Sequence, residues 1–197
     1  MRTEKSDWDK VITFHGHSCP GIATGYRVAK VALQKLQALR AADEELIAIV
    51  ENDSCGVDAI QVLTGCTFGK GNLVFNDLGK QVYTFVCRNS GRAVRIAVKG
   101  MARRKAPSLQ ELRDKVYGGT ASAEERKTFH DHQQERIRYI LDLPDDEFCE
   151  IQEVAIALPD KAKIYDSHTC AVCGEQVMEP RVRVKGGKIV CIPCAEH

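Results

Sequence analysis

The chain has 197 residues, of which 44% are hydrophobic and 28% are charged, so it is long enough for one full domain and a small second unit. Its 28 basic and 27 acidic side chains leave a formal net charge of +1, which argues against nucleic acid or an anionic membrane as the main partner. No run reaches the roughly 18–20 apolar residues of a membrane span, and the charged N-terminus excludes a secretory signal peptide, so we expect a cytoplasmic protein.

The first half of the chain predicts a helix, a strand, a second helix and three strands. Apolar residues recur at helical spacing over residues 20–40, where Pro20 suits the first turn of a helix. The apolar run ELIAIVEND predicts a buried strand, after which Asp53 or Ser54 could cap the second helix. The runs NLVFND, QVYTFVC and RAVRIAV predict the three further strands.

The second half predicts more helix, one more strand and a linker. Residues 107–141 have a helical and charged composition, in which Ser122 and Glu125 form a plausible capping box. The run EIQEVAIAL predicts a strand, and PDKAKIYDSH looks like a linker. We therefore predict an α+β fold with a mixed, mostly antiparallel sheet covered by helices, extra helices, and a small C-terminal zinc ribbon. The expected domains are residues 1–160 and 161–197.

The C-terminal segment carries two C-x-x-C pairs, CAVC and CIPC. They are Cys170 with Cys173 and Cys191 with Cys194, and Gly186–Gly187 between them predicts a hairpin. This spacing is typical of a structural Zn²⁺ site, since a unit this small cannot bury enough apolar surface to fold alone. A redox pair or an iron–sulfur cluster are the alternatives. The hairpin's basic side chains more often form a solvated face than a nucleic-acid contact; they are Arg181, Arg183, Lys185 and Lys188.

A second candidate metal site begins in the stretch FHGHSCPG, residues 14–21. His15, His17 and Cys19 project to one side if the backbone is extended. Cys55 stands at the start of the second predicted helix, where the helix N-terminus should lower the pKa of the thiol and favour its metal-binding thiolate. These four residues could form a mixed nitrogen and sulfur site with an open position. The alternative is two local hydrogen-bonding histidines and a small buried cysteine.

The motifs at these residues resemble a known family. FHGHSCPGIATGYRVA, ENDSCGVDAIQVLTGCTFGKGNL and CAVCGEQVMEPRVRVKGGKIVCIPC look like the FmdE family of formylmethanofuran dehydrogenase, over nearly the whole chain. The resemblance implies an α+β core of the predicted order. It also implies binding of zinc or another transition metal near the matching positions, which are His15, His17, Cys19, Asn52, Asp53 and Cys55.

For several other polar residues the sequence leaves more than one interpretation open. Asp58 and Gln61 are either a polar wall beside the metal or capping groups, and Cys66 is a further ligand, a redox partner or a packed thiol. Lys70 stands between Gly69 and Gly71, but the spacing of a phosphate-binding loop is absent. The remaining candidates are interpreted as solvent-facing or packing residues: His130 and His132, the basic run at residues 101–105, Cys87 and Cys149.

Three functions are compatible with these motifs. The favoured one is an accessory or subunit role in one-carbon or molybdopterin-enzyme metabolism, as a homodimer with molybdenum or tungsten enzyme subunits as possible partners. The second is a metal-dependent enzyme acting on a small carbonyl or one-carbon substrate, with His15 and Asp58 as candidate catalytic residues. The third is a zinc-ribbon interaction or nucleic-acid-binding module, which the near-neutral net charge disfavours. Whether the chain turns over a substrate is left open.

Overall fold

The chain forms two compact units in a computed structural model, which describes residues 5–100 and 107–197. The units are Met1–Lys161 and Ala162–His197. The basic run at residues 101–105, interpreted above as a solvated patch, lies outside the described residues.

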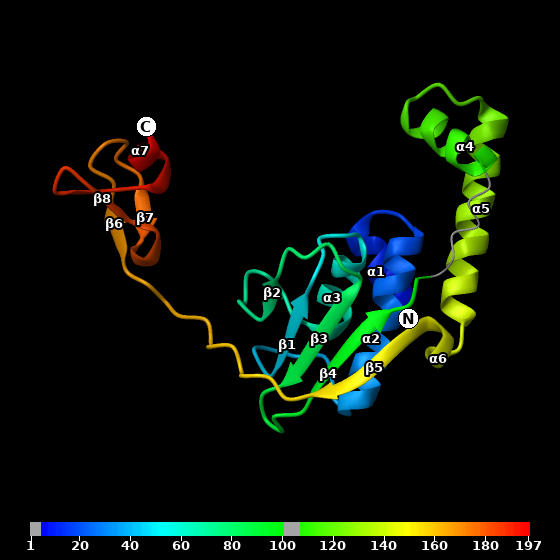
Figure 1. Cartoon of the computed structure of the whole chain (residues 1–197), viewed down its shortest axis with the longest axis horizontal. Helices are drawn as coiled ribbons and strands as arrows, with labels where there is room; N and C mark the ends of the chain where they lie inside the picture. The colour runs from blue at the N-terminus through cyan, green and yellow to red at the C-terminus, as the bar shows by residue number, and fades with distance from the viewer. Residues whose placement is uncertain (1–4, 101–106) are drawn as a thin grey trace. The chain divides into compact units, whose positions relative to one another are not determined.

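The first unit is built on a five-stranded mixed sheet in the order β2-β1-β3-β4-β5 (Figure 1). Strand β1 runs parallel to β2, and the remaining neighbours are antiparallel, as predicted for a mixed sheet. Its strands are β1 (Leu46–Val50), β2 (Leu73–Phe75), β3 (Val82–Cys87), β4 (Ala93–Val98) and β5 (Cys149–Val154). The prediction of a strand reaching residue 158 is wrong: Val154 pairs with Ala93, the first residue of β4, so no partner remains beyond it.

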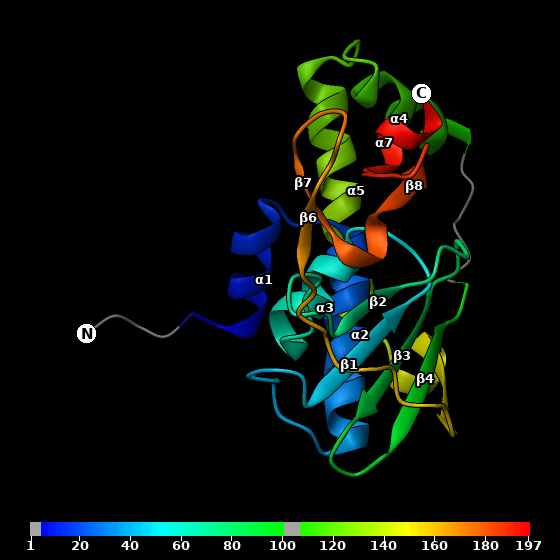
Figure 2. The same cartoon turned by 90° about the vertical axis from the view of Figure 1, so that its left-hand side faces the viewer.

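Helices α2 (Pro20–Leu36) and α3 (Gly56–Thr64) pack on one face of this sheet, and α1 (Asp7–His15) packs on these two helices. Figures 1 and 2 show α2 running along that face, and its apolar side joins the main core with β1, β3 and β4. Helix α2 stops at Leu36, short of the predicted residue 40, because Gln37 adopts a left-handed conformation (φ 52°) and its N–H bonds the carbonyl oxygens of the last turn.

Helix α1 corrects the expectation of an extended FHGHSCPG stretch. It is a short helix whose Ser6 and Asp9 form a capping box, and it ends at His15, where Gly16 adopts a left-handed conformation (φ 92°). His15 is therefore the last residue of a helix, and only the backbone from Gly16 to Cys19 lies between it and α2.

The helical region predicted after residue 107 contains two helices, α4 (Pro107–Tyr117) and α5 (Ala123–Asp142), separated at Gly118–Gly119, followed by the single turn α6 (Asp145–Phe148). The capping box of Ser122 and Glu125 is confirmed at the start of α5. Ile137 and Ile140 join the main core, so the C-terminal half of α5 packs on the domain.

The second unit consists of two small hairpins around a cluster of cysteines. Gly186 and Gly187, both with positive φ, make the predicted turn of the second hairpin. Its elements are β6 (Ser167–Thr169), β7 (Gln176–Met178), η1 (Glu179–Arg181), β8 (Arg183–Lys185), β9 (Lys188–Val190) and α7 (Ile192–Glu196). Strand β6 begins inside the predicted linker and pairs with β7, forming a hairpin that the sequence did not predict.

The buried cluster of this unit is small: Cys170, Val190 and Cys191, with a few partly buried neighbours. Such a core supplies little burial free energy, which is the expected condition of a unit held together by a metal. Among the helices in the described part of the chain, none is both long and apolar enough to cross a membrane.

Candidate metal centres

The first candidate centre is built where the N-terminal ends of α2 and α3 converge. The two helices touch at Gly25 and Gly56, where a Cβ on Gly25 would lie 2.0 Å from the carbonyl oxygen of Gly56. Only glycine permits this approach of one backbone to the other. The residue that caps each helix is a cysteine, Cys19 for α2 and Cys55 for α3.

The two thiols lie together because of this crossing. A Cβ built on Gly21 would lie 3.6 Å from Cys55 Sγ and 3.7 Å from Cys19 Sγ, and 3.0 Å from Cys55 Cβ. Gly21 therefore leaves the space that the thiols occupy. Cys19 Sγ also accepts a hydrogen bond from the Ile22 N–H at 3.4 Å, which fixes its position at the start of α2.

His15 and His17 complete the cluster from the end of α1. His15 Nε2 lies 3.9 Å from Cys19 Sγ, and the ring centroids of His15 and His17 are 4.5 Å apart. One donor atom each of His15, His17 and Cys19 lies within 4.8 Å of the others. Cys55 is outside this group of three and beside Cys19. The structure thus brings together the four residues that the sequence singled out.

Asp58 stands behind His15 in the arrangement common for metal-ligating histidines. Its Oδ2 accepts a 2.7 Å hydrogen bond from His15 Nδ1, which leaves Nε2 turned to Cys19. The side chain of His15 is only 12% exposed and that of Asp58 is 35% exposed. Gln61 Nε2 lies 3.4 Å from the other Asp58 oxygen, Oδ1. Asp58 therefore orients His15, and Gln61 contacts Asp58 from the next turn of α3.

The pKa of Cys55 differs from the sequence expectation. Burial and the neighbouring Cys19 thiol raise it, although Cys55 stands at a helix N-terminus. The Cys55 thiol makes no capping hydrogen bond to α3 that would favour its thiolate. A metal that binds Cys55 at neutral pH must therefore displace a proton from the thiol.

A hollow of about 420 Å³ adjoins the cluster, and it is lined by His15, Cys55 and Asp58 on the metal side. The exposed side chains Phe68 and Phe75 belong to its apolar part. The other lining residues are Val50, Asn52, Asp53, Ser54, Val57 and Leu73. This space could admit a small molecule next to the candidate ligands.

The Asn-Asp-Ser loop before α3 serves as a scaffold. Asn52 is buried; its amide nitrogen donates to the Lys80 carbonyl oxygen at 2.7 Å, and its Oδ1 accepts bonds from the N–H and hydroxyl of Ser54. The Ser54 hydroxyl is used in this turn, and the N-cap position of α3 is Cys55, so the predicted cap at Asp53 or Ser54 is wrong by one or two residues.

Cys66 lies away from this centre, beyond the C-terminal end of α3. It is fully buried, its thiol donates to the Leu46 carbonyl oxygen at 3.2 Å, and burial raises its pKa to about 11. These are the properties of a packed thiol.

The remaining candidate residues from the sequence lie outside the two centres. Lys70 donates to backbone carbonyl oxygens of Ala42 and Asp43 at 3.3 Å. His130 and His132 are exposed on α5, Cys149 is buried and Cys87 is partly buried.

Two features that support the first centre were not predicted from the sequence. Gly21 and Gly25 are four residues apart on α2, and this spacing was a readable sign of a close helix contact. Gln134 of α5 donates to the Ser18 hydroxyl at 3.2 Å, which ties the loop between His17 and Cys19 to a distant helix. No local pattern predicts such a contact.

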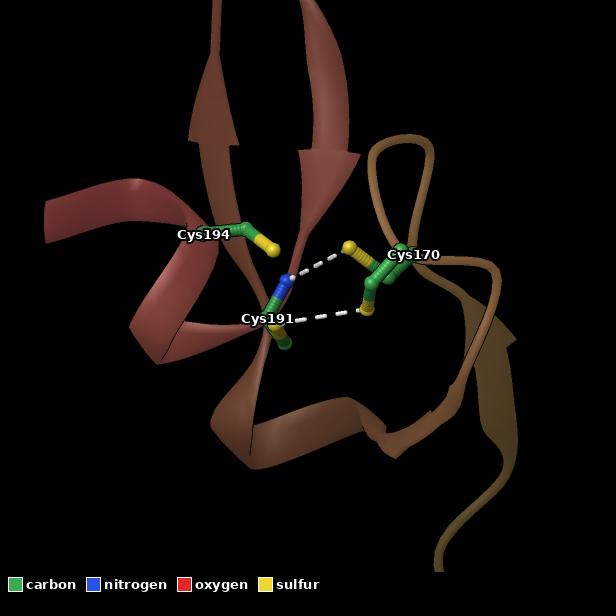
Figure 3. A group of neighbouring side chains, drawn as sticks. Cys170, Cys191 and Cys194 are labelled. Atoms are coloured by element: carbon green, nitrogen blue, oxygen red, sulfur yellow. Dashed lines mark hydrogen bonds between the residues drawn. The ribbon is translucent and has the colours of Figure 1, made fainter. Parts of the chain in front are cut away.

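The second centre is the cysteine cluster of the C-terminal unit. The sulfur atoms of Cys170, Cys173, Cys191 and Cys194 lie within 4.8 Å of one another, and Figure 3 labels three of these side chains. The Cys191 N–H donates to Cys170 Sγ at 3.3 Å, and Cys173 Sγ lies 3.9 Å from Cys191 Sγ. Hydrogen bonds from the backbone N–H groups of Cys173 and Cys191 lower the pKa of Cys170 to about 6. Four converging thiols, one favoured as thiolate, fit a tetrahedral Zn²⁺ site.

Models of known protein families match both units of the chain. The family model described as FmdE, molybdenum formylmethanofuran dehydrogenase operon, matches residues 14–150. The prokaryotic dksA/traR C4-type zinc finger matches residues 163–196, which indicates zinc at the C-terminal cluster.

A similar protein of Archaeoglobus fulgidus is named a probable S-adenosyl-L-methionine-binding protein. It is 36% identical over 189 residues, which cover 92% of this chain and 50% of the relative, so this chain spans about half of the relative's length. A solved structure from Syntrophus aciditrophicus, described as an FmdE-like protein of tungsten formylmethanofuran dehydrogenase, has the same fold. Its TM-score is 0.58 at 24% identity, over 94% of this chain and 88% of that one.

The FmdE match extends from Phe14, directly before the candidate ligand His15, to Glu150 in β5. It therefore spans the first centre, helices α2 and α3, and strands β1 to β4. Because the match covers well over half of the residues, the chain belongs to the FmdE family.

Proposed function

We propose that the chain is an accessory or subunit protein of one-carbon and molybdopterin-enzyme metabolism that holds a transition metal at His15, His17, Cys19 and Cys55. The observation that carries this proposal is the convergence of these side chains from the ends of three helices, with Asp58 bonded to His15 at 2.7 Å. The zinc finger is then a second, structural metal site.

The ligand chemistry supports an exchangeable transition metal. Imidazole and thiolate ligands suit zinc, copper, nickel or iron better than magnesium or calcium, which prefer oxygen. Cys55 and His17 are exposed, so the metal would be reachable from solvent. A metal with a reachable position can be delivered, sensed or used to bind a ligand.

The proposed partners follow from the names of similar proteins. The family description refers to a molybdenum formylmethanofuran dehydrogenase operon, and the structural neighbour is named for a tungsten formylmethanofuran dehydrogenase. On that basis we propose molybdenum or tungsten enzyme subunits as partners. A homodimer and a cytoplasmic location remain proposals from the sequence.

A second candidate function is the binding of S-adenosyl-L-methionine, the ligand named for the archaeal relative. The hollow beside His15 and Cys55 favours it, since that space combines apolar walls with carboxylates. The same space would also admit a small carbonyl or one-carbon substrate. There the metal would supply Lewis-acid chemistry, while Asp58 holds the His15 ring in place.

Elemental analysis of the purified full-length protein tests the metal proposal. We expect two metals per chain in the wild type and one in a Cys19→Ser/Cys55→Ser double variant, because the zinc finger keeps its own ion. A Cys66→Ser variant serves as the matched control, since its thiol lies in the core, and should retain two. One metal per chain in all three proteins would refute the first site.

A further inference from the structure

We propose that the hollow beside the first metal site binds an organic cation of the sulfonium class, with the positive group held between Asp53 and the rings of Phe68 and Phe75. This inference deepens the second candidate function and rests on it, because it assigns the ligand a place and names the residues that select it.

The lining of the hollow is charged with one sign only. It contains two carboxylates, Asp53 and Asp58, and no lysine or arginine is among the lining residues in the part of the chain that the structure describes. A larger groove of the same unit, about 960 Å³, is lined by Lys10, Lys30 and Arg40 and by one carboxylate, Asp7, which pairs with both lysines. Three cations against one carboxylate leave that lining net positive, so it would suit an anion better. The difference between the two spaces points to a cation as the ligand of the smaller one.

A bound metal would not reverse this sign. Two thiolates, Cys19 and Cys55, balance the charge of a divalent ion, so the carboxylates remain in excess. Asp58 is engaged with His15 and Gln61. Asp53 is exposed and, within residues 5–100 and 107–197, no hydrogen bond or ion pair joins it to another side chain. Asp53 is therefore the carboxylate that can pair with a ligand.

The two phenylalanines are unusually exposed for aromatic side chains, 79% for Phe68 and 44% for Phe75. A cation over an aromatic face is attracted by the ring quadrupole, and sulfonium and quaternary ammonium groups are recognised in this way. Two exposed rings and an unpaired carboxylate that line the same hollow supply the groups that such recognition uses.

The turn that carries Phe68 is held in place before any ligand arrives. The Thr67 N–H donates to Asn72 Oδ1 at 2.9 Å, and the Gly71 N–H donates to the Phe68 carbonyl oxygen at 3.0 Å. Asn72 is fully buried and donates to the carbonyl oxygens of Asp43 and Leu46 at 2.9 Å. The exposed ring thus stands on an ordered turn, which lowers the entropic cost of binding.

Calorimetric titration of the metal-loaded full chain with S-adenosyl-L-methionine and S-adenosyl-L-homocysteine tests the proposal. The two compounds differ by one methyl group and the positive charge of the sulfonium. We expect the sulfonium compound to bind about 5–20-fold more tightly, since an exposed ion pair and a cation–π contact each contribute a factor of up to about 5.

Two variants test which residues cause the preference for the sulfonium compound over the thioether. Asp53→Asn and Phe68→Leu should each weaken binding of the sulfonium compound about 2–5-fold and leave that of the thioether unchanged. Asp131→Asn, an exposed carboxylate on α5 outside the hollow, is the control and should change neither. Equal affinities for the two compounds, absence of binding by both, or an unchanged preference in Asp53→Asn and Phe68→Leu would overturn the proposal.

Metal analysis of the same samples separates this claim from the proposed metal site. Two metals per chain without a preference for the sulfonium compound refute the cation proposal alone. One metal per chain in the wild type refutes the metal site, whatever the titration shows.

Discussion

The close contact of helices α2 and α3 at Gly25 lets us predict how a substitution there changes stability and metal binding. In a Gly25→Ala variant the new Cβ would lie 2.0 Å from the Gly56 carbonyl oxygen and 2.5 Å from Gly56 Cα, whereas ordinary contacts begin at 3.4 Å. The atoms met are backbone, so no side chain can rotate away. Helices α2 and α3 must therefore move apart by roughly 1 Å or more.

The size of the effect follows from two opposing contributions. Overpacking a core costs typically about 1–3 kcal/mol, and a clash with rigid backbone belongs at the upper end. Replacing a helical glycine by alanine stabilises the helix by about 1 kcal/mol, because alanine has the higher helix propensity. We therefore expect a net destabilisation of about 2 kcal/mol, which for a protein of this size lowers Tm by about 4–8 °C.

The same movement should loosen the first metal site, because the two helices carry Cys19 and Cys55 at their starts. Thermal unfolding followed by circular dichroism, together with metal content after dialysis against a chelator, measures both effects. We expect the variant to lose the first metal and keep the second. Gly69→Ala is the control, since no atom lies within 4 Å of its added Cβ. A Gly25→Ala protein with the wild-type Tm and two retained metals would refute this account of the site.

Three other predictions concern single side chains. Asp58→Asn should reduce the metal affinity of the first site about 10–100-fold in a chelator competition, because His15 loses the carboxylate that orients it; an unchanged affinity would contradict the role of Asp58. The Cys66 thiol has a pKa of about 11 when folded, so the unfolded chain loses this proton first as pH rises above about 9. Stability should therefore fall with pH by up to about 1.4 kcal/mol per unit more steeply in the wild type than in Cys66→Ala, measured by urea unfolding between pH 8 and 10.5, and parallel slopes would argue against a buried neutral thiol. Ser122→Ala should cost about 1 kcal/mol in the same unfolding assay, since it removes the hydroxyl that caps α5, and a loss below about 0.3 kcal/mol would show that the cap contributes little.

The parts of the fold predicted correctly depend on local patterns. Pro20 fixes the start of α2, Ser122 and Glu125 fix the start of α5, and Gly186–Gly187 supply the hairpin turn. Each signal lies within a few residues of the feature it specifies. The two C-x-x-C pairs are equally local, so the cysteine cluster could be expected before its geometry was known.

The errors concern features that depend on distant parts of the chain. The pKa of Cys55 depends on burial and on Cys19, and a local helix-terminus argument gave the wrong direction. Helix α1 is an exception, because its signals are local: Trp8, Val11 and Ile12 have helical spacing directly after the Ser6 cap, and they were overlooked. The hydrogen bond from His15 to Asp58 joins residues 43 positions apart. Sequence spacing suggested both residues as candidates and could not pair them.

X-ray absorption spectroscopy of the metal-loaded wild-type protein tests the central claim most directly. If both sites hold zinc, four sulfurs in the finger and two sulfurs with two nitrogens in the first site average to three sulfurs and one nitrogen per metal. We therefore expect a sulfur shell near 2.3 Å and a nitrogen shell near 2.0–2.1 Å. If the first site holds another metal, its own edge should show two sulfurs and two nitrogens. A spectrum with four sulfurs and no nitrogen shell would contradict the histidine and cysteine site.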